Sequence, residues 1–345
     1  LAGAAAADLS ANWEHLDLPR LREGGVDLQF LISWVPEEVA AVEGASFDHA
    51  VRLIHAIHEV VGRARGVRVA RSVAEIDGAR EAGEVAILIG VEGGHAIENS
   101  LERLRDLHAL GARSLTLTWN NSNDWADASG VPPRHDGLTD FGREVVRTLN
   151  RLHMLVDVSH AAESTFFDVL ETSEAPVIAS HSCARALADH HRNLTDEQLR
   201  SLAAQGGVVG INFFPTFLDY EYGVAFERIE ADAEALAARL LENYGDEERA
   251  REEARSWRDA RLAELPPVPV QAVADHIDHV VQVAGSGAVG LGSDFDGIAT
   301  VPRGLPDVSA VPRITELLLR RGYDDDTIRA ILGGNFARVI RQVLP

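Results

Sequence analysis

The chain has 345 residues, which is enough for one large α/β barrel or for two domains of ordinary size. Its formal net charge of −22, with arginines scattered among acidic residues, argues against a nucleic-acid-binding protein, because no basic stripe is present to neutralise phosphates. The sequence contains no lysine, which excludes Schiff-base chemistry, a pyridoxal phosphate anchor and a Walker-type phosphate loop.

Apolar runs bounded by turn residues predict strands along the whole chain. They cover residues 26–34, 85–92, 114–120, 155–160, 176–182, 207–214 and 288–294. Segments with helical spacing lie between them, at residues 47–65, 138–153, 196–205 and 270–284. This alternation is typical of βαβ units and a parallel sheet. An eighth strand, which we expect before Leu1, would complete a (β/α)8 barrel of the TIM type.

Residues 225–265 depart from the alternation, because they are rich in Ala, Glu and Arg and contain no strand. Pro266, Pro267 and Pro269 follow the segment. We interpret it as a helical insertion between the strand runs 207–214 and 288–294. A flexible linker between two domains is the competing interpretation, but the segment has too many helix formers. We therefore expect residues 1–345 to form one barrel domain with a helical insertion.

The single cysteine, Cys183, excludes an internal disulfide framework and a cysteine-rich zinc site. A reducing cytoplasm is therefore the expected location. No apolar run approaches the roughly 20 residues of a membrane-spanning helix, so we expect no membrane association.

Metal-binding or acidic residues end several of the predicted strands. Glu92, His160, His181 and Asp294 each follow an apolar run. A lone histidine in such a place is more often a satisfied core group than a ligand. However, parallel strands joined by helices all end on the same face, so side chains just past these ends converge. The four placements together predict a metallohydrolase site, with Glu92, His160 and His181 as metal ligands.

Three charged residues, Asp294, Asp296 and Arg192, have open interpretations. Asp294 and Asp296 lie close together in SDFDG. Asp294 could serve as a metal ligand, a general base or an acid, and we assign the chemistry to it and an organising role in the loop to Asp296. Arg192 stands in the polar loop HHRNLTDE, where a guanidinium could pair with a substrate carboxylate. A surface arginine without a function is an equal alternative for Arg192.

The chain resembles the membrane dipeptidase, or renal dipeptidase, family of zinc peptidases, and in particular its bacterial members. The matching segments, in chain order, are GVEGGHAIE, DVSH, ASHS, HRNLTDEQL, NFFPTFL, VADHIDHV, GSDFDG, GLPDVS and GGNFARVIRQV. The resemblance implies a (β/α)8 barrel with two zinc ions that hydrolyses dipeptides, including those with a C-terminal D-residue. It implies that Glu92 bridges the zincs, His160 and His181 complete one of them, Arg192 binds the substrate carboxylate and Asp294 handles the proton.

The first departure from the family pattern concerns a His-x-Asp pair that ends the family's first strand and completes the other zinc. His15 and Asp17 have this spacing, but polar and Ala-rich residues precede them in place of a strand. We therefore treat His15 and Asp17 as decoys.

The second departure is Trp119, where better-known members have a histidine that contacts the reacting carbonyl. A tryptophan cannot accept a proton or bind metal. Stabilisation of the oxyanion must then depend on the metal or on a neighbouring asparagine, so we place Trp119 and Asn120 in the expected substrate-binding set.

The function expected from these features is a zinc-dependent dipeptidase that acts on small dipeptides. Alternatives are an N-acyl amino acid deacylase or another metal-dependent amidohydrolase on the same barrel, and a metal-deficient relative without catalytic activity. The sequence leaves open the preferred side chains, the metal that is loaded and the oligomeric state, with a homodimer among the options.

Overall fold

The computed structural model describes Leu9, Asn12 and residues 14–345. Its centre is a curled, parallel sheet whose neighbouring strands follow one another in chain order. The strands are β1 (Leu28–Trp34), β3 (Val85–Glu92), β4 (Ala112–Thr116), β5 (Leu155–Asp157), β6 (Ile178–Ala179), β7 (Val208–Ile211) and β8 (Val289–Leu291). Each of them overlaps one predicted strand run, so the parallel α/β barrel architecture is confirmed. Within the described residues, no pairing joins β8 to β1.

Strand β2 (Val67–Val69), which pairs with the beginning of β3, is not among the strands predicted from the sequence. Its three residues are too few to show a period in the sequence. Strand β4 begins two residues earlier than the predicted run, at Ala112.

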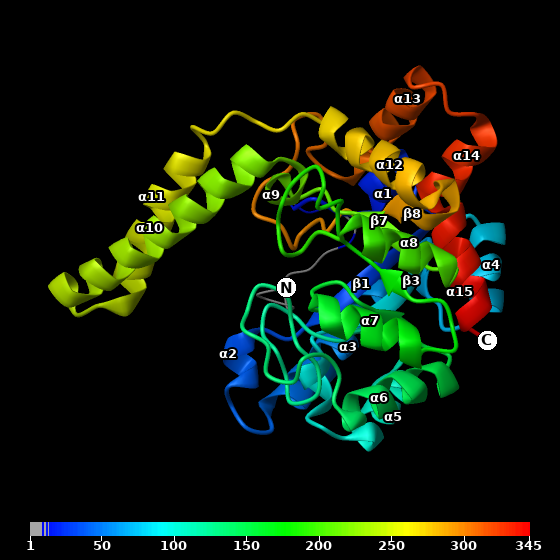
Figure 1. Cartoon of the computed structure of the whole chain (residues 1–345), viewed down its shortest axis with the longest axis horizontal. Coiled ribbons are helices and arrows are strands. Elements are labelled where there is room, and N and C mark those ends of the chain that lie inside the picture. Colours follow the sequence, from blue (N-terminus) through cyan, green and yellow to red (C-terminus); the bar gives the residue numbers. More distant parts are fainter. Residues whose placement is uncertain (1–8, 10–11, 13) are drawn as a thin grey trace.

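Helices surround the sheet (Figure 1). The longer ones are α3 (Ala45–Arg63), α4 (Val73–Glu81), α5 (Leu101–Leu110), α6 (Asp140–Arg151), α7 (Glu163–Thr172), α8 (Asp196–Ala204), α12 (Gln271–Ala284), α13 (Pro312–Arg320) and α15 (Asn335–Val343). Short elements are α1 (Leu18–Glu23), α2 (Glu37–Ala40), α9 (Pro215–Leu218), α14 (Asp325–Arg329), the 3-10 turns η1 (Gly94–Ile97), η2 (Ser286–Ala288) and η3 (Val308–Ala310), and the π turn η4 (Ala330–Gly334).

Local sequence explains where several helices begin. The Thr139 side chain caps α6, and Thr195 and Gln198 form a capping box at the start of α8. The four helical segments predicted from spacing correspond to α3, α6, α8 and α12.

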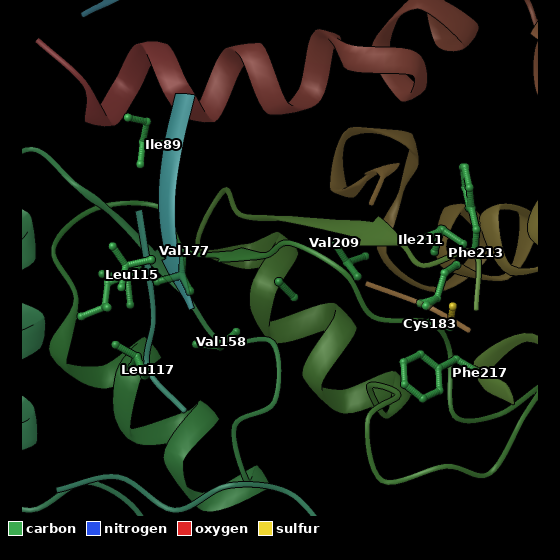
Figure 2. Packing of buried hydrophobic residues seen from close by; sticks show 14 of the residues in the cluster. Ile89, Leu115, Leu117, Val158, Val177, Cys183, Val209, Ile211, Phe213 and Phe217 are labelled. Atoms are coloured by element: carbon green, nitrogen blue, oxygen red, sulfur yellow. The ribbon is translucent and has the colours of Figure 1, made fainter. Parts of the chain in front are cut away.

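Strand β3 shows how the two faces of the sheet are used. Ile87, Ile89 and Val91 belong to the larger apolar cluster, whereas Ala86 and Leu88 belong to the smaller one, as the two-residue period of a strand requires. Figure 2 shows side chains of the larger cluster, which come from β3, β4 and β7 and from segments outside the strands. Glu92 continues the alternation of Ala86 and Leu88, so it projects on the same face as these two residues, at the carboxyl end of the strand.

Residues 225–265 lie mainly on α10 (Tyr220–Tyr244) and α11 (Glu247–Leu262). The two helices pack side by side and project away from the rest of the molecule (Figure 1). Among the described residues, no helix combines the length and apolar character that crossing a membrane requires.

Candidate metal and substrate site

Strand register places one row of side chains across the carboxyl ends of four neighbouring strands. Trp34 of β1 is the Cα partner of Glu92 of β3, Glu92 is that of Thr116 of β4, and Thr116 is that of Asp157 of β5. Paired residues of neighbouring strands project on the same face of a sheet. His160 and His181 follow β5 and β6 within three residues, so they reach the same end of the sheet.

Glu92, His160 and His181 form a compact cluster of potential ligand atoms. The Nε2 atoms of His160 and His181 lie 3.0 and 3.4 Å from Glu92 Oε1, and 3.1 Å from each other. The potential ligand atoms of these three residues all lie within 4.8 Å of one another, which is close enough for all three to hold one metal ion. One carboxylate and two imidazoles are a donor set that zinc takes in proteins.

Burial and neighbouring charges shift the pKa values of all three residues of this cluster. Burial tends to raise the pKa of Glu92, but the interactions of its carboxylate with both histidine rings outweigh burial and hold this pKa well below its ordinary value. Burial lowers the pKa of His160 to about 3, with the Arg192 charge acting in the same direction, so this imidazole is neutral and can act as a ligand. Burial would lower the pKa of His181, but the charges of Asp294 and Glu92 outweigh it and raise this pKa.

Two residues in the loops that follow the strands have a strained backbone conformation. His160 has a φ of 69° and Asp294 a φ of 57°, values that few non-glycine residues adopt. Backbone strain of this kind collects where surrounding contacts fix a functional side chain. Here a hydrogen bond of 3.1 Å joins His160 Nδ1 to Asn120 Oδ1, which leaves Nε2 directed at Glu92.

Arg192 is buried beside this cluster, with 4% of its surface exposed. Its Nη2 donates to the backbone carbonyl of His181 at 3.4 Å, and its guanidinium lies over the Phe217 ring. Its Nε and Nη1 atoms are buried and have no hydrogen-bond partner within the described structure. Burial lowers the pKa of Arg192 to about 10, so the side chain is still charged at neutral pH. The alternative of a surface arginine is therefore wrong.

Asp294 lies on the loop after β8, and its Oδ2 accepts a hydrogen bond of 3.0 Å from Asn212 Nδ2. Burial raises the pKa of Asp294. The charge of His181 acts in the opposite direction, and the negative charge of Glu92 raises this pKa further. Asp296, in contrast, is exposed and organises the loop. Its carboxylate accepts from the backbone N–H of His15 at 2.7 Å, and its own N–H donates to the His15 ring at 3.1 Å.

His15 and Asp17 do not join the Glu92 cluster. Asp17 is the N-cap of α1 and forms an ion pair of 3.0 Å with Arg20. His15 instead contacts the loop after β8, through Asp296 and the Phe295 ring.

Trp119 places an aromatic ring beside His160, one of the potential metal ligands. Its ring meets that of Trp34 edge to face at 5.0 Å and lies 6.4 Å from the His160 ring. Trp34 is not among the site residues expected from the sequence, although it ends an apolar strand run in the same way as Glu92. Asn212, which contacts Asp294, and Asp157, which precedes His160 in the motif DVSH, were not expected there either.

Several known proteins are similar to this chain in sequence. Residues 3–344 match the model of a family described as membrane dipeptidase, peptidase family M19. Dipeptidase 3 of Homo sapiens is 36% identical over 344 residues, which cover 96% of this chain and 59% of that protein. Dipeptidase 3 of Mus musculus is 35% identical over 332 residues, which cover 95% and 57%. The chain thus spans less than two thirds of the length of these curated relatives.

Solved structures extend the match to three dimensions. The structure of a dipeptidase of peptidase family M19 has a TM-score of 0.80 and 29% identity, covering 99% of this chain and 94% of its own. A metallopeptidase from Rhodobacter sphaeroides, liganded with a phosphinate mimic of the dipeptide L-Ala-D-Ala, has a TM-score of 0.77 and 30% identity, covering 96% and 91%.

Proposed function

The chain belongs to the membrane dipeptidase family, and we propose that it hydrolyses the peptide bond of dipeptides with the help of bound metal. One observation carries the proposal: a buried, charged Arg192 with unpartnered N–H groups lies next to the Glu92, His160 and His181 cluster. A cationic side chain next to a potential metal site suits a small substrate that has both a reacting amide and a free carboxylate.

Glu92, His160 and His181 would hold the metal, and zinc fits their chemistry. When bound, zinc would polarise the scissile carbonyl and make water more acidic. The binuclear centre that the family resemblance implies stays a prediction, since the described residues bring together the ligands of one cluster.

Arg192 would bind the C-terminal carboxylate of the substrate. Burial strengthens a charge-assisted hydrogen bond, and the planar guanidinium can offer two parallel N–H donors to a carboxylate. Because Arg192 is fixed to the backbone of His181, the carboxylate would be held a short distance from the metal ligands. Such an anchor restricts substrates to very short peptides.

Asp294 would accept a proton from the attacking water and return it to the leaving amine. A carboxylate with a raised pKa suits the return of the proton, because it holds a proton more readily than an exposed aspartate does. Asn212 fixes one of its oxygens and thereby orients the other.

A tolerance for a C-terminal D-residue is part of the proposal. The Rhodobacter sphaeroides peptidase with the L-Ala-D-Ala mimic supports it, since that structure shares the fold and 30% of its sequence with this chain. Binding of the substrate through its carboxylate places few restrictions on the configuration of the adjacent carbon. The cytoplasmic location, the single-domain organisation and the oligomeric state stay predictions.

A substrate panel tests this function. With zinc added, the protein should hydrolyse L-Ala-L-Ala and L-Ala-D-Ala at comparable rates and leave N-acetyl-L-alanine intact. Preferential hydrolysis of N-acetyl amino acids would favour a deacylase, which could use the same arginine. Failure to bind zinc would identify a metal-deficient relative. Binding of zinc without cleavage of either dipeptide would also overturn the proposal.

A further inference from the structure

A buried hydrogen-bond network connects the carboxylate of Asp157 to the ring of His181. Asp157 has 2% of its surface exposed. Its Oδ1 accepts from the backbone N–H groups of Ser159 and Ser180 at 3.0 and 2.9 Å. Its Oδ2 accepts from Thr116 Oγ1 at 2.7 Å and from Ser180 Oγ at 2.5 Å. Ser180 Oγ in turn lies 2.7 Å from His181 Nδ1.

The direction of these hydrogen bonds follows from the number of protons. A carboxylate can only accept, so the single hydroxyl hydrogen of Ser180 must point to Asp157. The Ser180 oxygen then faces His181 with a lone pair and must accept from Nδ1–H. With the proton on Nδ1, a neutral His181 has its free lone pair on Nε2, the atom that faces Glu92 and His160.

We infer that Asp157, acting through Ser180, is a positioning residue that fixes the tautomer of His181 in which Nε2 can bind metal. The inference rests on the proposed function, since it concerns a ligand of the proposed metal. Hydrogen bonds that orient the ligand histidines are part of a working metal site, because they decide which ring nitrogen is free.

The two histidines differ in how strongly their tautomers are enforced. His160 Nδ1 faces the side-chain oxygen of Asn120, an exposed residue. An amide can turn around and offer a donor in place of an acceptor. A carboxylate offers an acceptor in either orientation, so His181 is the ligand whose tautomer the fold determines.

The two oxygens of Asp157 have different hydrogen-bond partners, so the positioning role can be tested separately from a purely structural role. Oδ1 ties the loops after β5 and β6 together through backbone N–H groups. Oδ2 faces the side chains that lead to His181. A substitution that keeps the first set of contacts and reverses the second can therefore distinguish the two roles.

Asp157→Asn is this substitution. The amide oxygen can keep both backbone contacts, while the amide nitrogen donates to Thr116 and Ser180. The Ser180 hydroxyl is then free to donate to His181 Nδ1, which moves the ring proton to Nε2. We expect a folded protein in which His181 carries its proton on Nε2, and a zinc affinity about 10- to 100-fold lower than in the parent.

Two measurements on the full chain test this expectation. Long-range 15N–1H correlation spectra of the metal-free protein, at a pH where His181 is neutral, report which ring nitrogen carries the proton. Competition with a chelator reports the zinc affinity. Thr116→Val is the matched control, because it removes a hydrogen bond to the same Asp157 oxygen without lying on the path to His181. It should keep the proton on Nδ1 and bind zinc like the parent.

Ser180→Ala provides a second variant in case Asp157→Asn fails to fold. It keeps the Asp157 contacts to backbone but releases His181 Nδ1, so both tautomers should appear and zinc affinity should fall less than in Asp157→Asn. Unchanged tautomer and unchanged zinc affinity in these variants would overturn the inference. Failure of the proposed function would look different: the parent would show the Nδ1–H tautomer and bind zinc, but cleave no dipeptide.

Discussion

Arg192 donates through Nη2 to the backbone carbonyl of His181, at 3.4 Å. The residue proposed to bind the substrate carboxylate is thereby fixed to a residue proposed to bind the metal. Both residues lie between β6 and α8, so the distance between the carboxylate anchor and this metal ligand is set within one segment of the chain.

Arg192→Ala should reduce kcat/KM for free dipeptides by roughly 30-fold or more. A charge-assisted pair with a carboxylate in a buried pocket contributes on the order of 2 kcal/mol or more when one partner is removed. Steady-state kinetics on L-Ala-L-Ala and on its amide check this, because the amide lacks the carboxylate and should lose much less. Arg192→Lys should restore activity only in part, since an ammonium does not reproduce the planar pair of donors. Equal losses for acid and amide would refute the anchoring role.

Glu92→Gln should remove most of the bound metal and all measurable activity, because a neutral amide is a far weaker ligand than a carboxylate. Metal analysis after dialysis, together with the dipeptide assay, checks this. Glu84→Gln is the control, because Glu84 lies at the opposite end of β3 and pairs with Arg68. The control should keep metal and activity, and full activity in Glu92→Gln would refute the ligand role.

Asp294→Asn should lower kcat by about 100-fold or more and leave zinc content unchanged, since it removes a proton acceptor and not a proposed ligand. The rate should be measured with saturating dipeptide, and zinc content on the same sample. Loss of zinc together with activity would show that Asp294 acts as a ligand.

The same variant has a predicted effect on stability. Because burial raises the pKa of Asp294, the folded state holds this proton more tightly than the unfolded chain does. Ionised Asp294 therefore destabilises the fold, and this cost develops as pH rises from the unfolded pKa of about 3.9 through the folded value. Metal-free Asp294→Asn should melt at a higher temperature than the parent at neutral pH, and the difference should shrink toward pH 4.

Trp119→His should raise kcat for dipeptides by about 10-fold or more. The Trp119 ring lies 6.4 Å from the His160 ring, so a histidine here would stand at the edge of the site and could donate to the developing oxyanion. Trp119→Phe is the control, because it keeps an aromatic ring but supplies no donor. A rate for Trp119→His that does not exceed that of Trp119→Phe would refute this interpretation.

Much of the fold could be predicted from the sequence, because apolar residues recur at characteristic spacings in strands and helices. The buried runs before Glu92, His160 and His181 predicted three strand ends, which belong to β3, β5 and β6. Parallel connection then required their side chains to converge, and the structure brings these three together. The sequence also indicated that Asp296 serves its loop, whereas Asp294 faces the site.

Other features depend on contacts between residues that lie far apart in the chain, and only the tertiary structure decided them. The burial of Arg192 follows from the packing of its loop against Phe217 and His181, and a polar sequence around it gave no sign of this. The position of Trp34 beside Glu92 follows from strand register. The protonated nitrogen of His181 follows from Asp157, which reaches it through Ser180. A local pattern determines which residues end a strand, but burial, register and the direction of a hydrogen bond are set by neighbours that only folding brings together.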